Sequence, residues 1–189
     1  QMHVPFWGAL CLTIGFSVVL ALIIERLILR PMIGEPAISI IMVTIGLSLV
    51  LRSIVAAVWG TDILVYAPKL FPQETINVGG VPVSLEFTWC FILSILLLGL
   101  FSAFFKFSKA GVAMRATAFN QQAAQSMGIS VKFIFGLSWV ISAVISGIGG
   151  VLIGNINGIN TSLYHFGLKV FPATILGGLD AVLGSGLGG

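Results

Sequence analysis

The segment that decides the fold is residues 5–24, PFWGALCLTIGFSVVLALII, which carries no charged side chain. A helix rises about 1.5 Å per residue, so about 20 apolar residues cross the ~30 Å hydrocarbon core of a bilayer. The whole chain of 189 residues has the same character, with 58% hydrophobic and 8% charged residues, against about 25% charged in soluble domains. Its mean hydropathy is +1.12. We therefore expect an integral membrane protein.

Similar apolar runs recur along the chain and predict further membrane helices. Only one charge, Arg52, lies inside them. Turn-forming residues from Gly154 to Ser162 interrupt the last long run. The predicted spans are residues 5–24, 36–60, 87–105 and 133–153, followed by a short or re-entrant helix over 164–177. This pattern predicts an all-α, polytopic transmembrane protein with one membrane domain over residues 1–189.

The connections between the predicted spans indicate their sides of the membrane. Residues 75–85 alternate apolar and polar side chains around Gly79-Gly80, which predicts a small β-hairpin. Six basic residues fall on one side of the spans, and only Lys69 lies in a clear loop on the other. Because basic loops remain in the cytoplasm, we expect loops 25–35 and 106–132 to be cytoplasmic and the hairpin to be extracytoplasmic. The six are Arg26, Arg30, Lys106, Lys109, Arg115 and Lys132.

The residues do not form a catalytic constellation. No Asp, Glu or His falls within the four predicted spans, which argues against a proton relay. Cys11 and Cys90 lie in separate apolar runs, and the chain has no GxxxxGK[ST] phosphate loop. We therefore expect no catalytic residue, no metal and no cofactor, with any energy supplied by a partner. The net charge of +3 reflects membrane topology rather than nucleic-acid binding.

The loop over residues 107–132 contains an apolar stripe at helical spacing. The stripe consists of Val112, Ala116, Phe119, Ala123 and Met127. It predicts one amphipathic helix, which Gly128 is placed to cap. Such a helix could lie in the lipid headgroup layer or dock on a partner, and periodicity alone does not separate the two.

Small residues form a row at intervals of four in the fourth span. They are Ser138, Ser142, Ser146, Gly150 and Gly154. Rows of this kind let two helices approach closely in lipid, although the hydroxyls could also line a substrate path. Thr44, Gly46 and Ser48 in the second span allow the same two interpretations, because this stretch could expose backbone to a polar ligand.

Three stretches together resemble the permease subunits of branched-chain amino acid ABC importers. They are ERLILRP at 25–31, GVAMRA at 111–116 and AAQSMGI at 123–129. TIGLSLVL at 44–51, the Trp59-Gly60 pair and ILGG at 175–178 stand in the order expected of that family. The resemblance covers essentially the whole chain. It implies transport of branched-chain or related amino acids across a bacterial or archaeal cytoplasmic membrane.

The same resemblance implies the partners and the docking segment. The partners would be ABC ATPase subunits, a second permease subunit, a periplasmic or extracellular substrate-binding protein and the lipid bilayer. In such permeases an Ala-Ala-x-x-x-Gly loop inserts into a groove on the ATPase, so Ala123, Ala124 and Gly128 would occupy those positions. Gln122 stands where these loops often carry Glu. Arg115 belongs to the neighbouring motif, and Phe119 and Met127 would anchor the contact.

The resemblance leaves the substrate and the extent of the chain open. Family members begin with a further hydrophobic segment and continue with further membrane helix, so we expect this chain to be an internal fragment. No residue pattern identifies a pocket for an α-carboxylate and an α-amine. The same architecture could therefore serve urea, short amides or sugars, or the chain could be a membrane fragment that does not transport.

Overall fold

The computed structural model describes residues 6–65, 75–78, 81–160, 163–177 and 184. Four helices in this part of the chain are long and apolar enough to cross a membrane, which confirms an all-α, polytopic membrane fold. They lie within Gly8–Met32, Ile38–Trp59, Leu85–Phe107 and Val131–Asn157.

The first of these spans is built from several consecutive turns. α1 (Phe6–Ile24) continues into a π-helical turn, η1 (Glu25–Leu29), and then into a short 3-10 turn, η2 (Arg30–Met32). Pro31 stands within η2, where its fixed φ suits the start of a helical turn. The helix therefore extends past the predicted boundary at residue 24 and includes Glu25.

The other long helices also extend beyond their predicted ends. α2 spans Ala37–Trp59, α3 spans Leu85–Phe107 and α6 spans Val131–Asn157. α6 therefore includes Asn155 and Asn157, which the sequence placed in a loop. The expectation that the spans contain no carboxylate is wrong, because Glu86 lies in the first turn of α3 and Glu25 within the first span.

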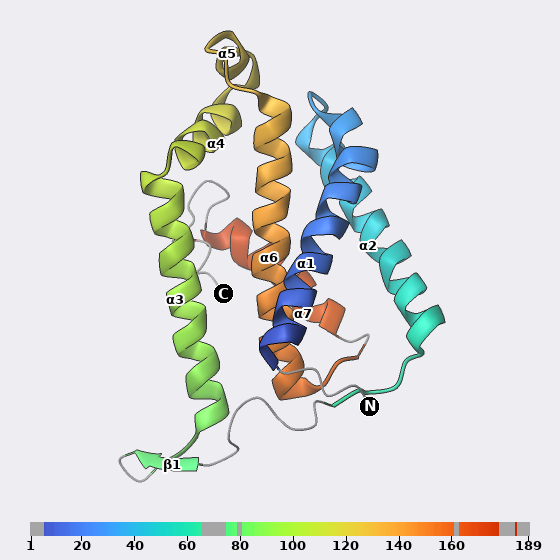
Figure 1. Ribbon diagram of the computed structural model, residues 1–189, viewed down its shortest axis with the longest axis vertical. Helices are drawn as coiled ribbons and strands as arrows, with labels where there is room; N and C mark the ends of the chain where they lie inside the picture. The colour runs from blue at the N-terminus through green and yellow to red at the C-terminus, as the bar shows by residue number, and fades with distance from the viewer. Residues whose placement is uncertain (1–5, 66–74, 79–80, 161–162, 178–183, 185–189) are drawn as a thin grey trace. The chain divides into compact units, whose positions relative to one another are not determined.

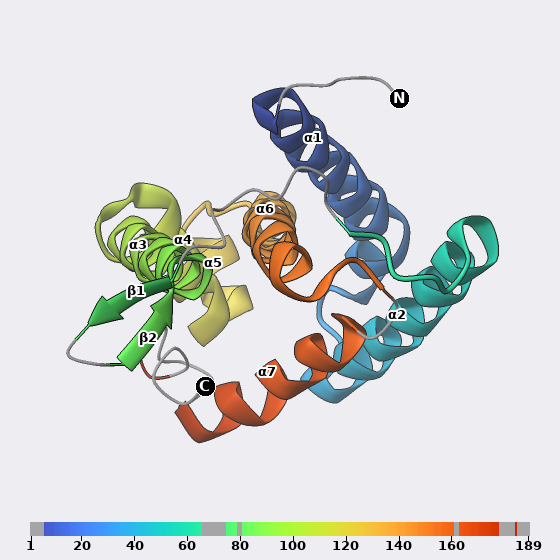
Figure 2. The same ribbon diagram turned by 90° about the horizontal axis from the view of Figure 1, so that it is seen from below.

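Three shorter helices and two strands complete the described fold. α4 (Lys109–Phe119) and α5 (Gln121–Ser126) connect the end of α3 to the start of α6 (Figure 1), and α7 spans Leu163–Gly177. β1 (Thr75–Val78) and β2 (Val81–Ser84) pair antiparallel, with Thr75 opposite Ser84 (Figure 2). Gly79, Gly80 and Lys69 lie outside the described residues.

The described chain forms two compact units. One comprises residues 1–51 and 104–148, and the other residues 52–103 and 149–189. The buried apolar side chains are concentrated in the first unit, where they come from α1, η1, α4, α5 and the start of α6. They are Ala21, Leu29, Met114, Ala124, Val131 and Ile134. The long helices of both units expose large apolar side chains such as Phe16, Met42 and Phe91, as expected of surfaces covered by lipid or by another membrane subunit.

Candidate functional site

The candidate site is the connection formed by α4 and α5 in the first unit. α4 begins at Ser108, whose hydroxyl accepts a hydrogen bond from the backbone N–H of Gly111 at 2.9 Å. Serine suits this position because its side chain satisfies a free N–H of the first turn. The chain therefore leaves α3 and starts α4 within a single residue.

Gly111 and Arg115 hold the start of α4 against the last turn of α3. A Cβ at position 111 would lie 2.8 Å from the Cα of Phe105, so only glycine fits this close approach. The Arg115 guanidinium donates a hydrogen bond to the Phe105 carbonyl, and its Cζ lies 5.4 Å from the centroid of the Phe105 ring. Arg115, predicted as a docking residue, thus positions α4 within the chain itself.

Asn120 divides the segment that the sequence predicts as one amphipathic helix. Its backbone is extended, with φ −156° and ψ 107°, and its side-chain oxygen accepts a hydrogen bond from the N–H of Ala123 at 2.9 Å. The prediction of a single helix is therefore wrong. The apolar period of three or four residues continues across residue 120, but asparagine favours a helix N-cap over a helix interior.

The predicted docking residues differ in their exposure. Phe119 is 96% exposed and Met127 is 83% exposed, and they lie at the two ends of α5. Gln122 and Ala123 are exposed as well, whereas Ala124 is only 3% exposed and belongs to the local core.

Gly128 ends α5 as expected, with φ +83° and its N–H donating to the Gln125 carbonyl at 2.9 Å. The next residue, Ile129, donates its N–H to the Ala124 carbonyl at 3.0 Å. Both bonds satisfy carbonyl groups at the helix end, in the manner of a glycine C-cap. Met127 is thus presented on a closed turn rather than on a free loop.

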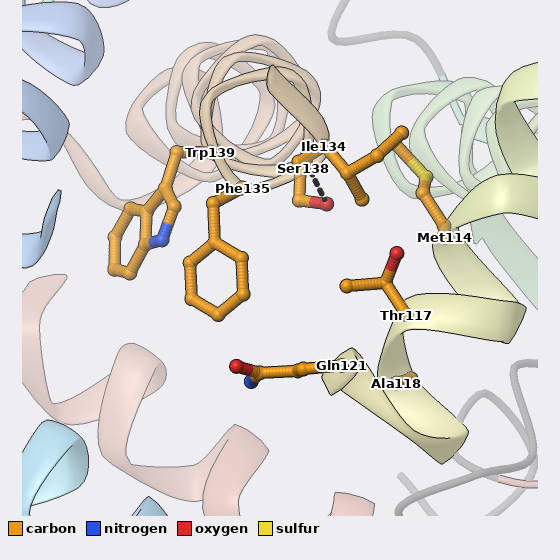
Figure 3. A pocket seen from close by; sticks show the side chains of 8 residues that line it. All are labelled: Met114, Thr117, Ala118, Gln121, Ile134, Phe135, Ser138 and Trp139. Atoms are coloured by element: carbon orange, nitrogen blue, oxygen red, sulfur yellow. Dashed lines mark hydrogen bonds between the residues drawn. The ribbon is translucent and has the colours of Figure 1, made fainter. Parts of the chain in front are cut away.

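A cavity of about 220 Å³ lies beside α4, α5 and the start of α6 (Figure 3). Met114 and Ile134, both buried, lie on one side of the cavity, and Phe135 and Trp139 supply aromatic walls. The Gln121 amide projects toward Phe135 from the opposite side (Figure 3). The walls are largely apolar.

The hydroxyls at this cavity are already used by their own helices. Ser138 donates to the Ile134 carbonyl at 2.9 Å, drawn as a dashed line in Figure 3, and Thr117 donates to the Ala113 carbonyl at 2.8 Å. Each of these donors is therefore satisfied without a ligand.

The predicted row of small residues on α6 does not make the close helix contact in the first unit. Ser142, Ser146 and Gly150 are exposed, and nothing lies within 4 Å of the Cβ position at Gly150. The close approach occurs at Gly147, where a Cβ would lie 3.0 Å from the Ser17 hydroxyl of α1. Gly136 lies about three turns earlier on the same face of α6, beside Glu25. Gly154 is buried in the second unit.

Thr44, Gly46 and Ser48 lie in the unbroken helix α2, so the backbone groups of this stretch take part in helix hydrogen bonds. Thr44 donates its hydroxyl to the Ile41 carbonyl at 2.8 Å and Ser48 to the Ile45 carbonyl at 2.7 Å. Both hydroxyls therefore donate within their own helix, and a substrate contact at these residues stays a prediction.

Two polar pairs were missed by the sequence reasoning. Arg30 Nε lies 3.2 Å from Glu25 Oε1, and the Glu25 side chain is only 3% exposed. In the second unit, the Asn155 amide donates to Glu86 Oε1 at 2.6 Å. Glu25 and Arg30 stand five residues apart in one motif, so the sequence offered a reason to pair them. Glu86 and Asn155 stand 69 residues apart, and no sequence pattern links them.

Among the described residues, no three His, Cys, Asp or Glu side chains gather where they could hold a metal ion. The site that the structure describes is built of packing contacts, helix caps and exposed apolar groups. Its chemistry suits binding to another surface.

The chain matches known proteins along its length. A family model described as "Branched-chain amino acid transport system / permease component" matches residues 1–189. The high-affinity branched-chain amino acid transport system permease protein LivH of Salmonella typhimurium is 29% identical over 173 residues, covering 88% of this chain and 56% of that protein. No solved structure matches.

Two further relatives have similar sequence identity to this chain and similar coverage. The permease protein BraD of Pseudomonas aeruginosa is 30% identical over 173 residues, covering 88% of this chain and 56% of BraD. A probable branched-chain amino acid transport permease protein LivH of Methanocaldococcus jannaschii is 30% identical over 176 residues, covering 88% of this chain and 55% of that protein. The chain thus spans about half the length of the curated relatives it matches.

Proposed function

Because the chain belongs to the family of branched-chain amino acid transport permease components, we propose that it is the membrane-spanning subunit of an ABC importer. It moves branched-chain or related amino acids across the cytoplasmic membrane of a bacterium or archaeon. ATP hydrolysis takes place in partner ATPase subunits. The relatives are named as transport permease proteins, and four helices are long and apolar enough to cross a membrane. Both findings support this assignment.

The assembly contains a second permease subunit and an extracytoplasmic substrate-binding protein. Large apolar side chains exposed along the long helices supply surface for lipid and for the second permease. The basic residues at η1, η2, the end of α3, α4 and the start of α6 support a cytoplasmic location for those ends and an extracytoplasmic one for β1 and β2. The chain acts as one membrane domain in this assembly.

The connection formed by α4 and α5 docks on the ATPase subunit. The observation that carries this assignment is the exposure of two large apolar side chains, Phe119 at 96% and Met127 at 83%, which flank the capped helix α5. Exposed apolar anchors of this kind supply most of the binding free energy at interfaces. Gln122 and Ala123 contribute to the same face, and Arg115, Ala124 and Gly128 hold its shape.

The local core beneath this surface connects it to the membrane helices. Ala124 in α5, Met114 in α4 and Ile134 in α6 are all buried in the first unit. We infer that binding at Phe119 or Met127 reaches the start of α6 through the cavity walls that α4 and α6 share. ATP-bound partners can shift the permease between two conformations only by as much as they bind one conformation more tightly than the other. The contact at Phe119 and Met127 is the place where this difference in binding free energy arises.

Cross-linking from α5 tests the docking assignment. Ser126 is exposed on α5, so a Ser126→Cys variant, with Cys11 and Cys90 replaced by alanine, should cross-link to the ATPase subunit in native membranes. The matched control is Ser53→Cys on the exposed side of α2. The full-length protein is used. Equal labelling of the two positions, or none at residue 126, would contradict docking and return the segment to the lipid headgroup layer.

A charged side chain at residue 127 tests whether Met127 contributes to the free energy of ATPase binding. Met127→Glu should weaken ATPase binding by more than about tenfold, because an interface anchor contributes about 2 kcal/mol or more. Gln125→Glu adds the same charge at an exposed position of α5 outside the proposed anchors and serves as the control. Co-purification of the ATPase measures the change. If both variants retain the ATPase equally, Met127 is not an anchor.

A further inference from the structure

The first membrane span changes its helical geometry at the motif that begins with Glu25. In η1 the backbone N–H of Arg30 donates to the Glu25 carbonyl, five residues earlier, which is the spacing of a π-helix. Such turns are rare and occur mostly as single turns inside α-helices, often at functional sites. Pro31 disfavours a regular α-helix through this point, because its ring clashes with the carbonyl four residues before it. The sequence of the motif itself therefore favours the wider turn.

The side chains of the same two residues form an ion pair that depends on this turn. Arg30 Nε lies 3.2 Å from Glu25 Oε1, and Arg30 Nη2 lies 3.4 Å from Glu25 Oε2. In an α-helix each residue turns the chain by about 100°, so residues five apart point about 140° apart around the axis. In η1 the two residues are instead joined by both backbone and side chains. A change of η1 to α-helical geometry would therefore separate Arg30 from Glu25.

Glu25 also lies against the start of α6. A Cβ at Gly136 would lie 3.7 Å from the Glu25 carboxyl carbon, and the Glu25 side chain is 3% exposed. A buried carboxylate needs its charged partner, because removal of that partner leaves an uncompensated charge and is strongly destabilising. The ion pair is thus required while Glu25 stays covered by α6. If α6 moves away and water reaches the carboxylate, this requirement falls.

The opposite side of α6 faces the connection formed by α4 and α5, within the same unit. Ile134 and Ser138 line a cavity together with Met114 of α4. Each of these two α6 residues is two positions from Gly136, and so lies about 200° from it around the helix axis. The start of α6 therefore lies between the proposed docking connection and the buried ion pair. A displacement of this part of α6 changes the surroundings of Glu25.

We propose that η1 is a conformational switch that responds to docking of the ATPase subunits. In the resting form the ion pair between Glu25 and Arg30 holds the π-helical turn. When docking moves the start of α6, Glu25 is uncovered, the ion pair opens and the turn becomes α-helical. The chain after residue 30 then rotates relative to α1. The proposal rests on the proposed function, and it names the part of the first span that changes during transport.

Deletion of Leu27 removes the need for the π-helical turn and keeps the ion pair. Leu27 is 71% exposed, so its loss removes little buried surface. Without it, Glu25 and Arg30 stand four residues apart, the spacing at which opposite charges pair along an α-helix. The matched control is Leu27→Ala, because it removes the same side chain and keeps the spacing of five residues.

Uptake of L-leucine by the complete, full-length transporter in proteoliposomes measures the effect of the deletion. The deletion should lower ATP-driven uptake at least about fivefold, the lower end of usual coupling between two sites. Co-purification of the ATPase subunits should be unchanged, and Leu27→Ala should transport like the unmodified protein. Equal uptake by the deletion variant and by Leu27→Ala would overturn the proposal.

A distance measurement tests the switch without altering the turn. Leu12 on α1 and Glu35 beyond η2 are exposed, so nitroxide labels on Leu12→Cys and Glu35→Cys span the turn. Cys11 and Cys90 are replaced by alanine. The labels should show two distances, and a nonhydrolysable ATP analogue should change their proportions in the complete transporter. Labels on Leu12→Cys and Ile23→Cys, both within α1, should show one distance throughout.

This measurement keeps the proposal testable even where the deletion variant does not fold. A single distance across the turn that the ATP analogue leaves unchanged would overturn the switch. Equal changes in both label pairs would also overturn it, because the motion would then lie within α1 rather than at η1.

Failure of the switch and failure of the proposed function give different results. ATP-driven uptake of leucine by the unmodified transporter tests the function alone. If that transporter works and the deletion variant works equally well, the switch fails although the function stands. If the two distances respond to the ATP analogue but no leucine is taken up, the switch stands and the assigned substrate fails.

Discussion

Two carboxylates, Glu25 and Glu86, are both buried, and each is stabilised by a different kind of partner. Glu25 is paired with a charged group, Arg30, whose side chain is 40% exposed. Glu86 is paired with a neutral amide, that of Asn155, which is 2% exposed. A buried carboxylate is costly unless it is hydrogen-bonded or paired, so both contacts are needed.

Helix α6 takes part in both arrangements in different ways. At Gly136 it supplies no side chain, and a Cβ there would lie 3.7 Å from the Glu25 carboxyl carbon. At Asn155 it supplies the hydrogen-bond donor itself. The comparison teaches that charge balance is local in the first unit, within one turn of helix, whereas in the second unit the carboxylate depends on a residue far away in the sequence.

The largest effect is expected from removing the charged partner of Glu25. Arg30→Met should lower the free energy of unfolding by about 3 kcal/mol, because it leaves the buried carboxylate unpaired. SDS-induced unfolding in mixed micelles measures this loss. Adding Glu25→Gln to Arg30→Met should restore most of the stability. A double variant as unstable as Arg30→Met would show that side-chain packing, rather than charge, explains the loss.

A smaller effect is expected at the amide pair. Asn155→Leu removes the donor to Glu86 and should cost about 2 kcal/mol, the range for hydrogen bonds to charged groups. Glu86→Gln should cost less than about 1 kcal/mol, since its carbonyl oxygen can still accept from Asn155. The same unfolding assay distinguishes the two variants. Equal losses would mean that the charge of Glu86 has its own role.

The smallest effect is expected at Gly136. Gly136→Ala should change the free energy of unfolding by less than about 1 kcal/mol, because the new methyl group meets Glu25 at ordinary van der Waals distance and alanine favours helix. Gly147→Ala serves as a contrast, since its Cβ would lie 3.0 Å from the Ser17 hydroxyl. If both alanine variants behave alike, α1 and α6 do not approach closely at Ser17.

The sequence predicted where the connection between α3 and α6 lies better than it predicted the internal structure of that connection. The spacing of Phe119 and Met127 identified two residues that are indeed exposed, and Gly128 was recognised as a helix end. Ala124 was grouped with them by its place in a motif, yet it is buried. A motif shows which residues occur together in the sequence. It does not show which side of a six-residue helix packs against the local core.

The expected packing row on α6 illustrates a second limit. Small residues spaced four apart and small residues spaced eleven apart, such as Gly136 and Gly147, both line up along one face of a helix. The sequence alone does not say which of the two faces packs against a neighbouring helix. The structure places Gly136 and Gly147 toward η1 and α1 and leaves Ser142, Ser146 and Gly150 exposed. Those exposed residues remain available to the proposed substrate path or to the proposed second permease subunit.

By itself the sequence determined that this protein lies in a membrane and crosses it with long apolar helices, because hydropathy and helix length are local properties of the chain. Only the tertiary structure brought Asn155 to Glu86 and Ile159 to Leu64. These contacts join residues that are distant in sequence. Their meeting depends on how helices pack and where each helix ends, and no periodicity in the sequence records it.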